Sequence, residues 1–88
     1  MRMIYKYPIK VTDKQTVVVE NCSGVASKII RVGLDPANMR PCVWIEFTPG
    51  AYQKKWEIFI YGTGQQIPES RLHVGSFVEG PFVWHVYI

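Results

Sequence analysis

The sequence is poor in cysteine, has no long apolar run and carries little excess charge of either sign. It contains only two cysteines in 88 residues, Cys22 and Cys42, which argues against the disulfide framework of a small secreted domain. None of its apolar runs approaches the ~20 residues of a membrane-spanning helix, and it shows no secretory leader pattern. We therefore expect a cytoplasmic protein with free thiols and no membrane partner.

The net charge is +3, from ten Lys and Arg against seven Asp and Glu. A domain that binds nucleic acid usually shows a denser basic patch than this. The charge therefore disfavours nucleic acid as a partner and is typical of a solvated basic strand face.

Catalytic and metal-binding motifs are also missing. The only histidines, His73 and His85, lie on predicted strands, where a lone histidine is more often a packed or surface side chain than a base. The two cysteines and two histidines supply the ligand atoms of a zinc site but not its paired spacing. The sequence therefore predicts no enzyme, no metal site and no cofactor.

What the chain has instead is a series of short β-branched and aromatic runs separated by turn residues. Segment 25–34 also fits a helical period, but its β-branched density favours a strand. The pattern predicts an all-β fold, a small antiparallel β-sandwich or barrel of about seven short strands in one domain over residues 1–88. The predicted strands are 1–11, 16–20, 25–34, 42–48, 55–61, 72–78 and 82–88.

Strands 42–48 and 55–61 are joined across Pro49 and Gly50, which predicts an antiparallel hairpin. Each carries aliphatic residues on one face and large rings such as Trp44 on the other. A sheet face exposed to water would be polar, so we expect this second face to be covered. The chain has 3 Trp, 5 Tyr and 4 Phe, more ring surface than one small domain easily hides, which predicts a homo-oligomer.

The stretch 54–68 contains the most distinctive corner, Gly62-Thr63-Gly64. Two glycines one residue apart allow φ > 0 at both positions and close approach of another group. The corner lacks the Lys-Ser/Thr and the following helix of a phosphate loop. It is read either as a tight β-corner or as the rim of a binding site.

In the second reading, polar groups beside rings bind a planar ligand such as a nucleobase, and an arginine meets its phosphate. The predicted ligand-binding residues are Trp56, Tyr61, Gly62, Thr63, Gly64, Gln65, Gln66, Arg40 and Arg71.

The block 60–64, Ile-Tyr-Gly-Thr-Gly, is followed by Ile67-Pro68. On this block the chain resembles a family of small uncharacterised phage and prophage proteins. The likeness extends to residues 4–9, 41–44, 74–77 and 84–86. The resemblance transfers no activity or catalytic residue, and it implies the cytoplasm of a bacterial host as the setting.

Three hypotheses follow. The first is a non-enzymatic phage accessory protein that counteracts host antiphage defence, by sequestering a nucleotide signal or by masking a host defence protein. The second is a structural or assembly component of the virion, with the aromatic face as a subunit contact. The third is an enzyme that uses His73 or His85. The surplus of aromatic surface and the missing catalytic set favour the first.

Overall fold

The β-branched and aromatic runs form strands, and each strand turns one row of apolar side chains inward. The computed structural model describes residues 1–88 and contains seven strands and no helix, which confirms the all-β prediction. Segment 25–34 becomes a strand from Lys28 onward. The strands are β1 (Met3–Pro8), β2 (Lys14–Cys22), β3 (Lys28–Leu34), β4 (Pro41–Phe47), β5 (Tyr52–Gly62), β6 (His73–Glu79) and β7 (Phe82–Tyr87).

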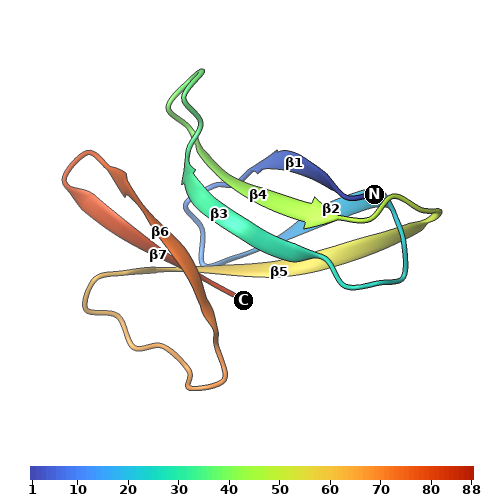
Figure 1. Cartoon of the computed structure of the whole chain (residues 1–88). Coiled ribbons are helices and arrows are strands. Elements are labelled where there is room, and N and C mark those ends of the chain that lie inside the picture. The colour runs from blue at the N-terminus through green and yellow to red at the C-terminus, as the bar shows by residue number, and fades with distance from the viewer.

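The strands pair into two antiparallel sheets that pack against each other as a sandwich (Figure 1). The three-stranded sheet has the order β1-β4-β3, and the four-stranded sheet has the order β2-β5-β7-β6. The edge strands β1 and β2 each pair with only one neighbour, so each keeps one unpaired edge. The structure has no helix long and apolar enough to cross a membrane.

The predicted hairpin of 42–48 with 55–61 is wrong, because β4 and β5 belong to different sheets. Their connection crosses the end of β2 instead of reversing the chain. The Ser23 N–H donates to the Thr48 carbonyl at 2.7 Å, and the Gly50 N–H donates to the Asn21 carbonyl at 3.0 Å. A Cβ on Gly50 would lie 2.6 Å from the Ser23 Cα. Only glycine fits this crossing, so Pro49-Gly50 marks a passage between sheets.

The core lies between the two sheets, and its buried residues come from the inward rows of five strands and from the residue after β1. The predicted alternation in β4 and β5 is confirmed. Val43, Ile45 and Phe47 are buried on the inward face of β4, and Ile58 and Ile60 are buried on the inward face of β5. The buried cluster consists of Ile9, Val17, Val19, Cys22, Val43, Ile45, Phe47, Ile58, Ile60, Phe77 and Val86.

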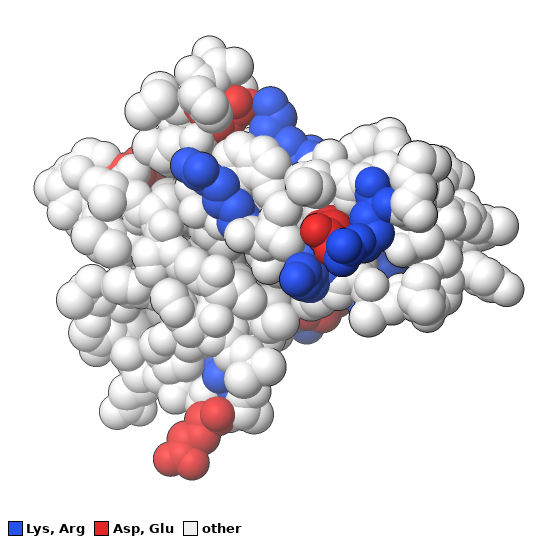
Figure 2. Space-filling view, in the orientation of Figure 1, with Lys and Arg blue, Asp and Glu red and all other residues white.

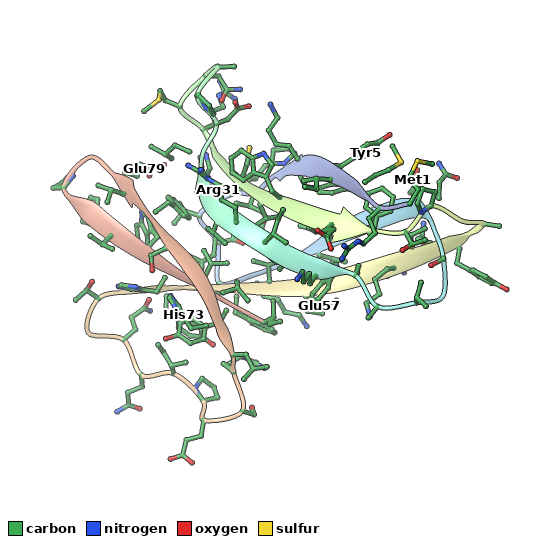
Figure 3. All side chains as sticks on the ribbon, viewed as in Figure 1. Met1, Tyr5, Arg31, Glu57, His73 and Glu79 are labelled. Carbon is green, nitrogen blue, oxygen red and sulfur yellow. The ribbon has the colours of Figure 1, made fainter.

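The large rings on the outer faces are covered by cationic side chains. The Arg31 guanidinium, labelled in Figure 3, lies 5.3 Å from the Trp44 ring centre on the three-stranded sheet. On the four-stranded sheet, the Arg71 guanidinium carbon lies 3.6 Å from the Phe59 ring centre and the Lys14 ammonium lies 5.9 Å from it. Each contact shields a ring face and is favourable in itself. Part of the covering expected for the second face is therefore supplied within the chain.

An ion pair ties edge strand β1 to the turn after β3. The Lys6 ammonium donates to Asp35 Oδ2 at 2.6 Å, and the Ala37 N–H donates to Asp35 Oδ1 at 3.0 Å. The hydrogen bond from Lys6, followed by the one from Ala37, holds the pKa of Asp35 below its usual range. The hydrogen bond to Asp35 in turn raises the pKa of Lys6. Cys42 is buried nearby, and this burial raises the pKa of its thiol.

Candidate ligand-binding site

A β-bulge in β6 places two polar side chains on the outer face of the four-stranded sheet. His73 pairs with Tyr87 and Ser76 pairs with His85, while the register shifts between His73 and Gly75. In a regular strand, residues 73 and 76 would point to opposite faces because side chains alternate. The extra residue of the bulge brings both to the same face. Val74, between them, packs against the core.

The bulge completes a chain of four hydrogen-bonded side chains that runs from β6 across β7 to the residue after β5. His73 Nε2 lies 3.1 Å from Ser76 Oγ, and Ser76 Oγ lies 3.0 Å from His85 Nδ1. His85 Nε2 lies 3.1 Å from the hydroxyl of Thr63, which follows β5. Both nitrogens of His85 are therefore engaged, and its ring orientation is fixed.

This hydrogen-bond chain has two self-consistent directions, because each neutral imidazole has one donor and one acceptor nitrogen. In one direction Thr63 donates to His85, His85 donates to Ser76, and Ser76 donates to His73. In the other, His73 donates to Ser76, and the Thr63 hydroxyl becomes the final acceptor. A His73 that carries both protons selects the second direction, which leaves the Thr63 hydroxyl hydrogen free to bond a ligand.

Arg71 stands beside this chain on the same face. It precedes His73 by two residues, the spacing that puts both side chains on one side of an extended segment. Its Nε donates to the Tyr61 hydroxyl at 3.4 Å, and its guanidinium lies over Phe59. The terminal nitrogens of Arg71 make no bond in the protein. A planar guanidinium with free terminal nitrogens suits bidentate recognition of a phosphate or carboxylate.

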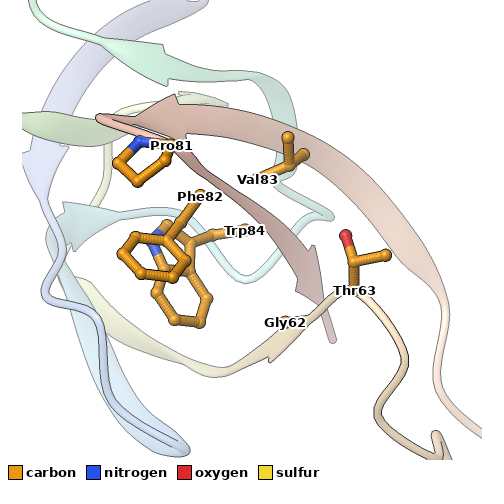
Figure 4. Close-up of a pocket in the computed structure, with 6 residues that line it drawn as sticks. All are labelled: Gly62, Thr63, Pro81, Phe82, Val83 and Trp84. Carbon is orange, nitrogen blue, oxygen red and sulfur yellow. The ribbon is translucent and has the colours of Figure 1, made fainter.

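A notch opens because β5 ends before it reaches the first two residues of the antiparallel strand β7. Gly62 is the last residue of β5 and pairs with Trp84, so Phe82 and Val83 pair only with β6. The backbone of β7 is consequently free on the β5 side, which leaves N–H and C=O groups available to a ligand edge. The notch has a volume of about 230 Å³, and its lining residues, drawn in Figure 4, are Gly62, Thr63, Pro81, Phe82, Val83 and Trp84.

Two aromatic rings form one wall of the notch. The Phe82 and Trp84 ring centres lie 5.7 Å apart with an interplanar angle of 30°, and Figure 4 shows the two rings overlapping in projection. Phe82 is 57% exposed, so most of its ring can contact a ligand. The volume lies below the ~300–1,000 Å³ of pockets for drug-sized ligands. The notch therefore fits one small planar group rather than a whole large ligand.

The structure brings together four of the residues predicted from the sequence. Tyr61 bonds Arg71 on the outer face, and Gly62 and Thr63 line the notch. The second glycine, Gly64, has φ of +94° and forms the corner. The expectation of φ > 0 at both glycines is wrong for Gly62. That residue is extended, and its missing Cβ makes room for the Trp84 ring, whose nearest atom would be 3.3 Å away.

Other predicted residues lie differently. Gln65 turns back, and its Oε1 accepts the Gly62 N–H, so its amide closes the corner. Gln66 is exposed and makes no side-chain hydrogen bond. Trp56 is five residues before Tyr61, about 17 Å along an extended strand, and its Nε1 donates to Ser27 at 3.1 Å. The prediction that Trp56 lies beside the corner is wrong, because it points to the opposite sheet face.

Arg40 also lies away from the site. It belongs to the turn between β3 and β4, where its backbone N–H donates to Asn38 Oδ1. This turn extends from the three-stranded sheet, whereas the Gly-Thr-Gly corner lies at the far side of the four-stranded sheet (Figure 1). Sequence reasoning cannot separate the two, since both arginines follow turn residues. Arg71 is thus the arginine positioned to meet a phosphate at this site.

The predicted ligand-binding set left out His73, Ser76, His85 and Phe82, and the two histidines entered only as possible catalytic residues. The outward alternation of His85 with Tyr87 in β7 was visible, but a lone strand histidine carried no functional signal. Pairing His85 with Ser76 requires the register of β6 and the position of its bulge. That information comes only from the folded structure.

The charges around the site favour an anion. Arg71, His73 and His85 take part in no ion pair, since the three ion pairs of the chain involve Arg2, Lys6 and Lys14. Figure 2 shows the face of the three-stranded sheet, where basic and acidic atoms lie side by side and the β6–β7 end is largely uncharged. The structure contains no group of three or more His, Cys, Asp or Glu side chains that could hold a metal ion.

Comparison with known proteins yields one family. A family model described as Domain of unknown function (DUF7352) matches residues 1–88. Neither a curated protein nor a solved structure matches the chain. The description of the family assigns no activity, so a function has to be argued from the site itself.

Proposed function

The chain belongs to the DUF7352 family over its whole length, and from this premise we propose that it is a non-catalytic binding protein for a phosphorylated planar ligand such as a nucleotide. The base would occupy the notch, and the phosphate would lie between Arg71 and His73. The observation that carries the proposal is that Thr63 lines the notch and also bonds His85. Thr63 thereby joins the notch to the outer face, where Arg71, His73 and His85 lie without a carboxylate partner.

The dimensions of the site support a nucleotide over a bare anion. The notch accepts one planar group, against which Phe82 can stack and the free β7 backbone can bond. Base–aromatic stacking contributes about 1–3 kcal/mol. A hydrogen bond to a charged group contributes about 1.5–3 kcal/mol. Stacking of the base and hydrogen bonding of the phosphate together give a nucleotide more affinity than either phosphate or a nucleoside alone would have.

The hydrogen bonds around Ser76 support binding over catalysis. A serine nucleophile needs a histidine base that a third group, usually a carboxylate, orients and stabilises as imidazolium. Here the second nitrogen of His85 meets the neutral Thr63 hydroxyl. That arrangement orients a hydrogen-bond donor for a ligand and offers little stabilisation to a charged histidine.

The biological role that fits this site is sequestration of a nucleotide signal used in host antiphage defence. This follows from the resemblance to phage and prophage proteins, with the cytoplasm of the host as the setting. Masking of a host defence protein is the variant of this role in which the same face contacts a protein.

A structural or assembly role in the virion is the second candidate. It is favoured by the exposed apolar tip of the β6–β7 hairpin, where Val78 is 55% and Val83 40% exposed. Such a tip suits a permanent subunit contact. Mass spectrometry of purified particles separates the two candidates, since a virion part is found in the particle and a sequestering protein is not.

The binding proposal is tested by isothermal titration with adenosine and uridine 5′-monophosphates, their nucleosides and inorganic phosphate. We expect the monophosphates to bind more tightly than the nucleosides. Arg71→Gln should remove this difference, a loss of about 10- to 100-fold. Arg31→Gln is the matched control, because Arg31 also covers a ring but lies on the other sheet. No nucleotide binding, or equal binding by Arg71→Gln, would refute the proposal.

A second substitution tests the notch. Phe82→Ala should weaken monophosphate binding by about 5- to 100-fold through lost stacking while leaving the weak binding of inorganic phosphate unchanged. Tyr52→Ala is its control, since Tyr52 is 67% exposed on a distant end of β5. If Phe82→Ala and Tyr52→Ala weakened monophosphate binding equally, the notch would not be the site of the base.

A further inference from the structure

A second concave site lies between the unpaired edges of β1 and β2, away from the nucleotide site. Figure 3 labels Tyr5 on β1 and His73 on β6 far apart in the molecule. The tyrosine groove has a volume of about 260 Å³ and is lined by Tyr5, Tyr7, Val18, Glu20 and Asn21.

Two tyrosine rings supply one wall of the tyrosine groove. Tyr5 and Tyr7 are two residues apart on β1 and therefore share a face. Tyr5 is 50% exposed, and its ring packs edge-on against Phe47 with ring centres 5.3 Å apart. Burial, together with the nearby Tyr5, raises the pKa of Tyr7, so its phenol stays neutral. Neutral tyrosine rings attract cations through their faces.

A carboxylate without a cationic partner lies at the same groove. Glu20 is in no ion pair, and its only side-chain bond comes from Gln53 Nε2 at the long distance of 3.5 Å. Lys55 lies across from Val18 on β5, yet it forms no ion pair with Glu20. The groove thus combines aromatic faces, an aliphatic floor at Val18 and a free negative charge.

We propose that the tyrosine groove binds an organic cation, a primary ammonium or guanidinium group on an aliphatic stem. The stem would lie on Val18 and the rings, and the charge would lie at Glu20. The volume is below that of pockets for drug-sized ligands, so the groove fits a small diamine or one basic side chain. These two sources share the same chemistry, and the test separates them.

The test is an NMR titration of the ¹⁵N-labelled protein with putrescine, N-acetyl-lysine amide and the uncharged N-acetyl-norleucine amide. We expect saturable shifts at Tyr5, Tyr7 and Glu20 with both cations and none with the norleucine compound. Tighter binding of putrescine assigns the groove to a free diamine, and tighter binding of the lysine amide assigns it to a partner's side chain. Saturable binding of the norleucine compound, or no shift with either cation, overturns the proposal.

Substitutions make the test specific to the groove. Glu20→Gln should weaken cation binding about 5- to 10-fold, whereas Glu79→Gln, an exposed carboxylate at the other end, should leave it unchanged. Tyr5→Leu should weaken binding about 3- to 10-fold and Tyr5→Phe much less, because the ring face rather than the hydroxyl meets the cation. Unchanged binding by Glu20→Gln refutes the proposal. Arg71→Gln should leave cation binding intact, which separates this site from the nucleotide site.

Discussion

Asp35 is the one charged side chain of the protein that is almost fully buried, at 5% exposed. A buried carboxylate is tolerated only where its charge is paired and its oxygens are bonded. Lys6 and the Ala37 N–H satisfy one oxygen each. The pair Asp35-Pro36 is a typical turn signal in the sequence, but nothing local reveals this partner, because Lys6 reaches Asp35 across β4 from another strand. Single residues are therefore well assigned to turns and strands, while their partners depend on pairing.

The Asp35–Lys6 pair predicts how stability changes with acidity. The pKa of Asp35 is lowered in the folded protein, so its contribution is complete above the unfolded pKa of about 3.9 and is lost as the pH falls through the folded value. Asp35→Asn should lower the melting temperature at pH 7. Below about pH 4 the wild-type curve should fall more steeply and approach that of the variant.

The measurement is thermal unfolding followed by circular dichroism between neutral and acidic pH. Asp13→Asn is the control, because the Asp13 carboxylate makes no bond in the structure. Parallel curves for the wild type and Asp35→Asn at all pH values would contradict this prediction.

At the scale of elements, the strands were predictable and their pairing was not. Alternation is a local property, so β4 and β5 were recognised with their inward faces correctly assigned. Several of their partners come from distant parts of the chain: β4 pairs with its neighbour β3 but also with β1, and β5 lies between β2 and β7, neither of which adjoins it in sequence. The bulge in β6 is equally invisible to alternation, and it decides that His73 and Ser76 share a face. The Tyr61–Thr63 part of the site could be found because it is continuous in sequence.

The bulge glycine also sets how closely the sheets approach. A Cβ on Gly75 would lie 2.6 Å from the Val32 Cβ, so β6 packs against β3 only because residue 75 has no side chain. Gly75→Ala should destabilise the fold by about 1–3 kcal/mol through overpacking. For a domain of this size, each kcal/mol lowers the melting temperature by roughly 4–8 °C.

Gly33→Ala provides the matched comparison on the neighbouring strand. A Cβ there would have its nearest contact at an ordinary 3.5 Å, to Arg31 Nε, and it should be neutral or stabilise the fold by up to about 1 kcal/mol. Urea unfolding of both variants measures the difference. Similar stability of the two would show that the sheets adjust freely at Gly75.

The whole molecule is held together mainly by contacts between distant segments. Only β3–β4 and β6–β7 pair as neighbours in sequence, whereas β1–β4, β2–β5 and β5–β7 enclose other strands. Closing such loops costs chain entropy before the contacts form, and this slows folding. We expect the chain to fold in milliseconds to seconds. The measurement is tryptophan fluorescence recorded during refolding after rapid dilution from urea. Folding in microseconds would contradict the expectation that pairing between distant strands limits the folding rate.

Self-association stays a prediction at this scale. The prediction rests on ring surface that a small domain cannot hide, and Arg31 and Arg71 shield part of that surface. The rings that remain exposed, Tyr5, Tyr52 and Phe82, lie on three different strands. An interface would therefore form around one of these strands rather than over a whole sheet.

The two cysteines are free and buried, Cys22 in β2 and Cys42 in β4, so each layer of the sandwich carries one protected thiol. A thiol reagent in solution modifies such a group only after the surrounding structure has opened. The two labelling rates consequently record how often each layer opens, without any engineered probe. Equal rates would mean that the layers open as one unit, and unequal rates would identify the one that opens first.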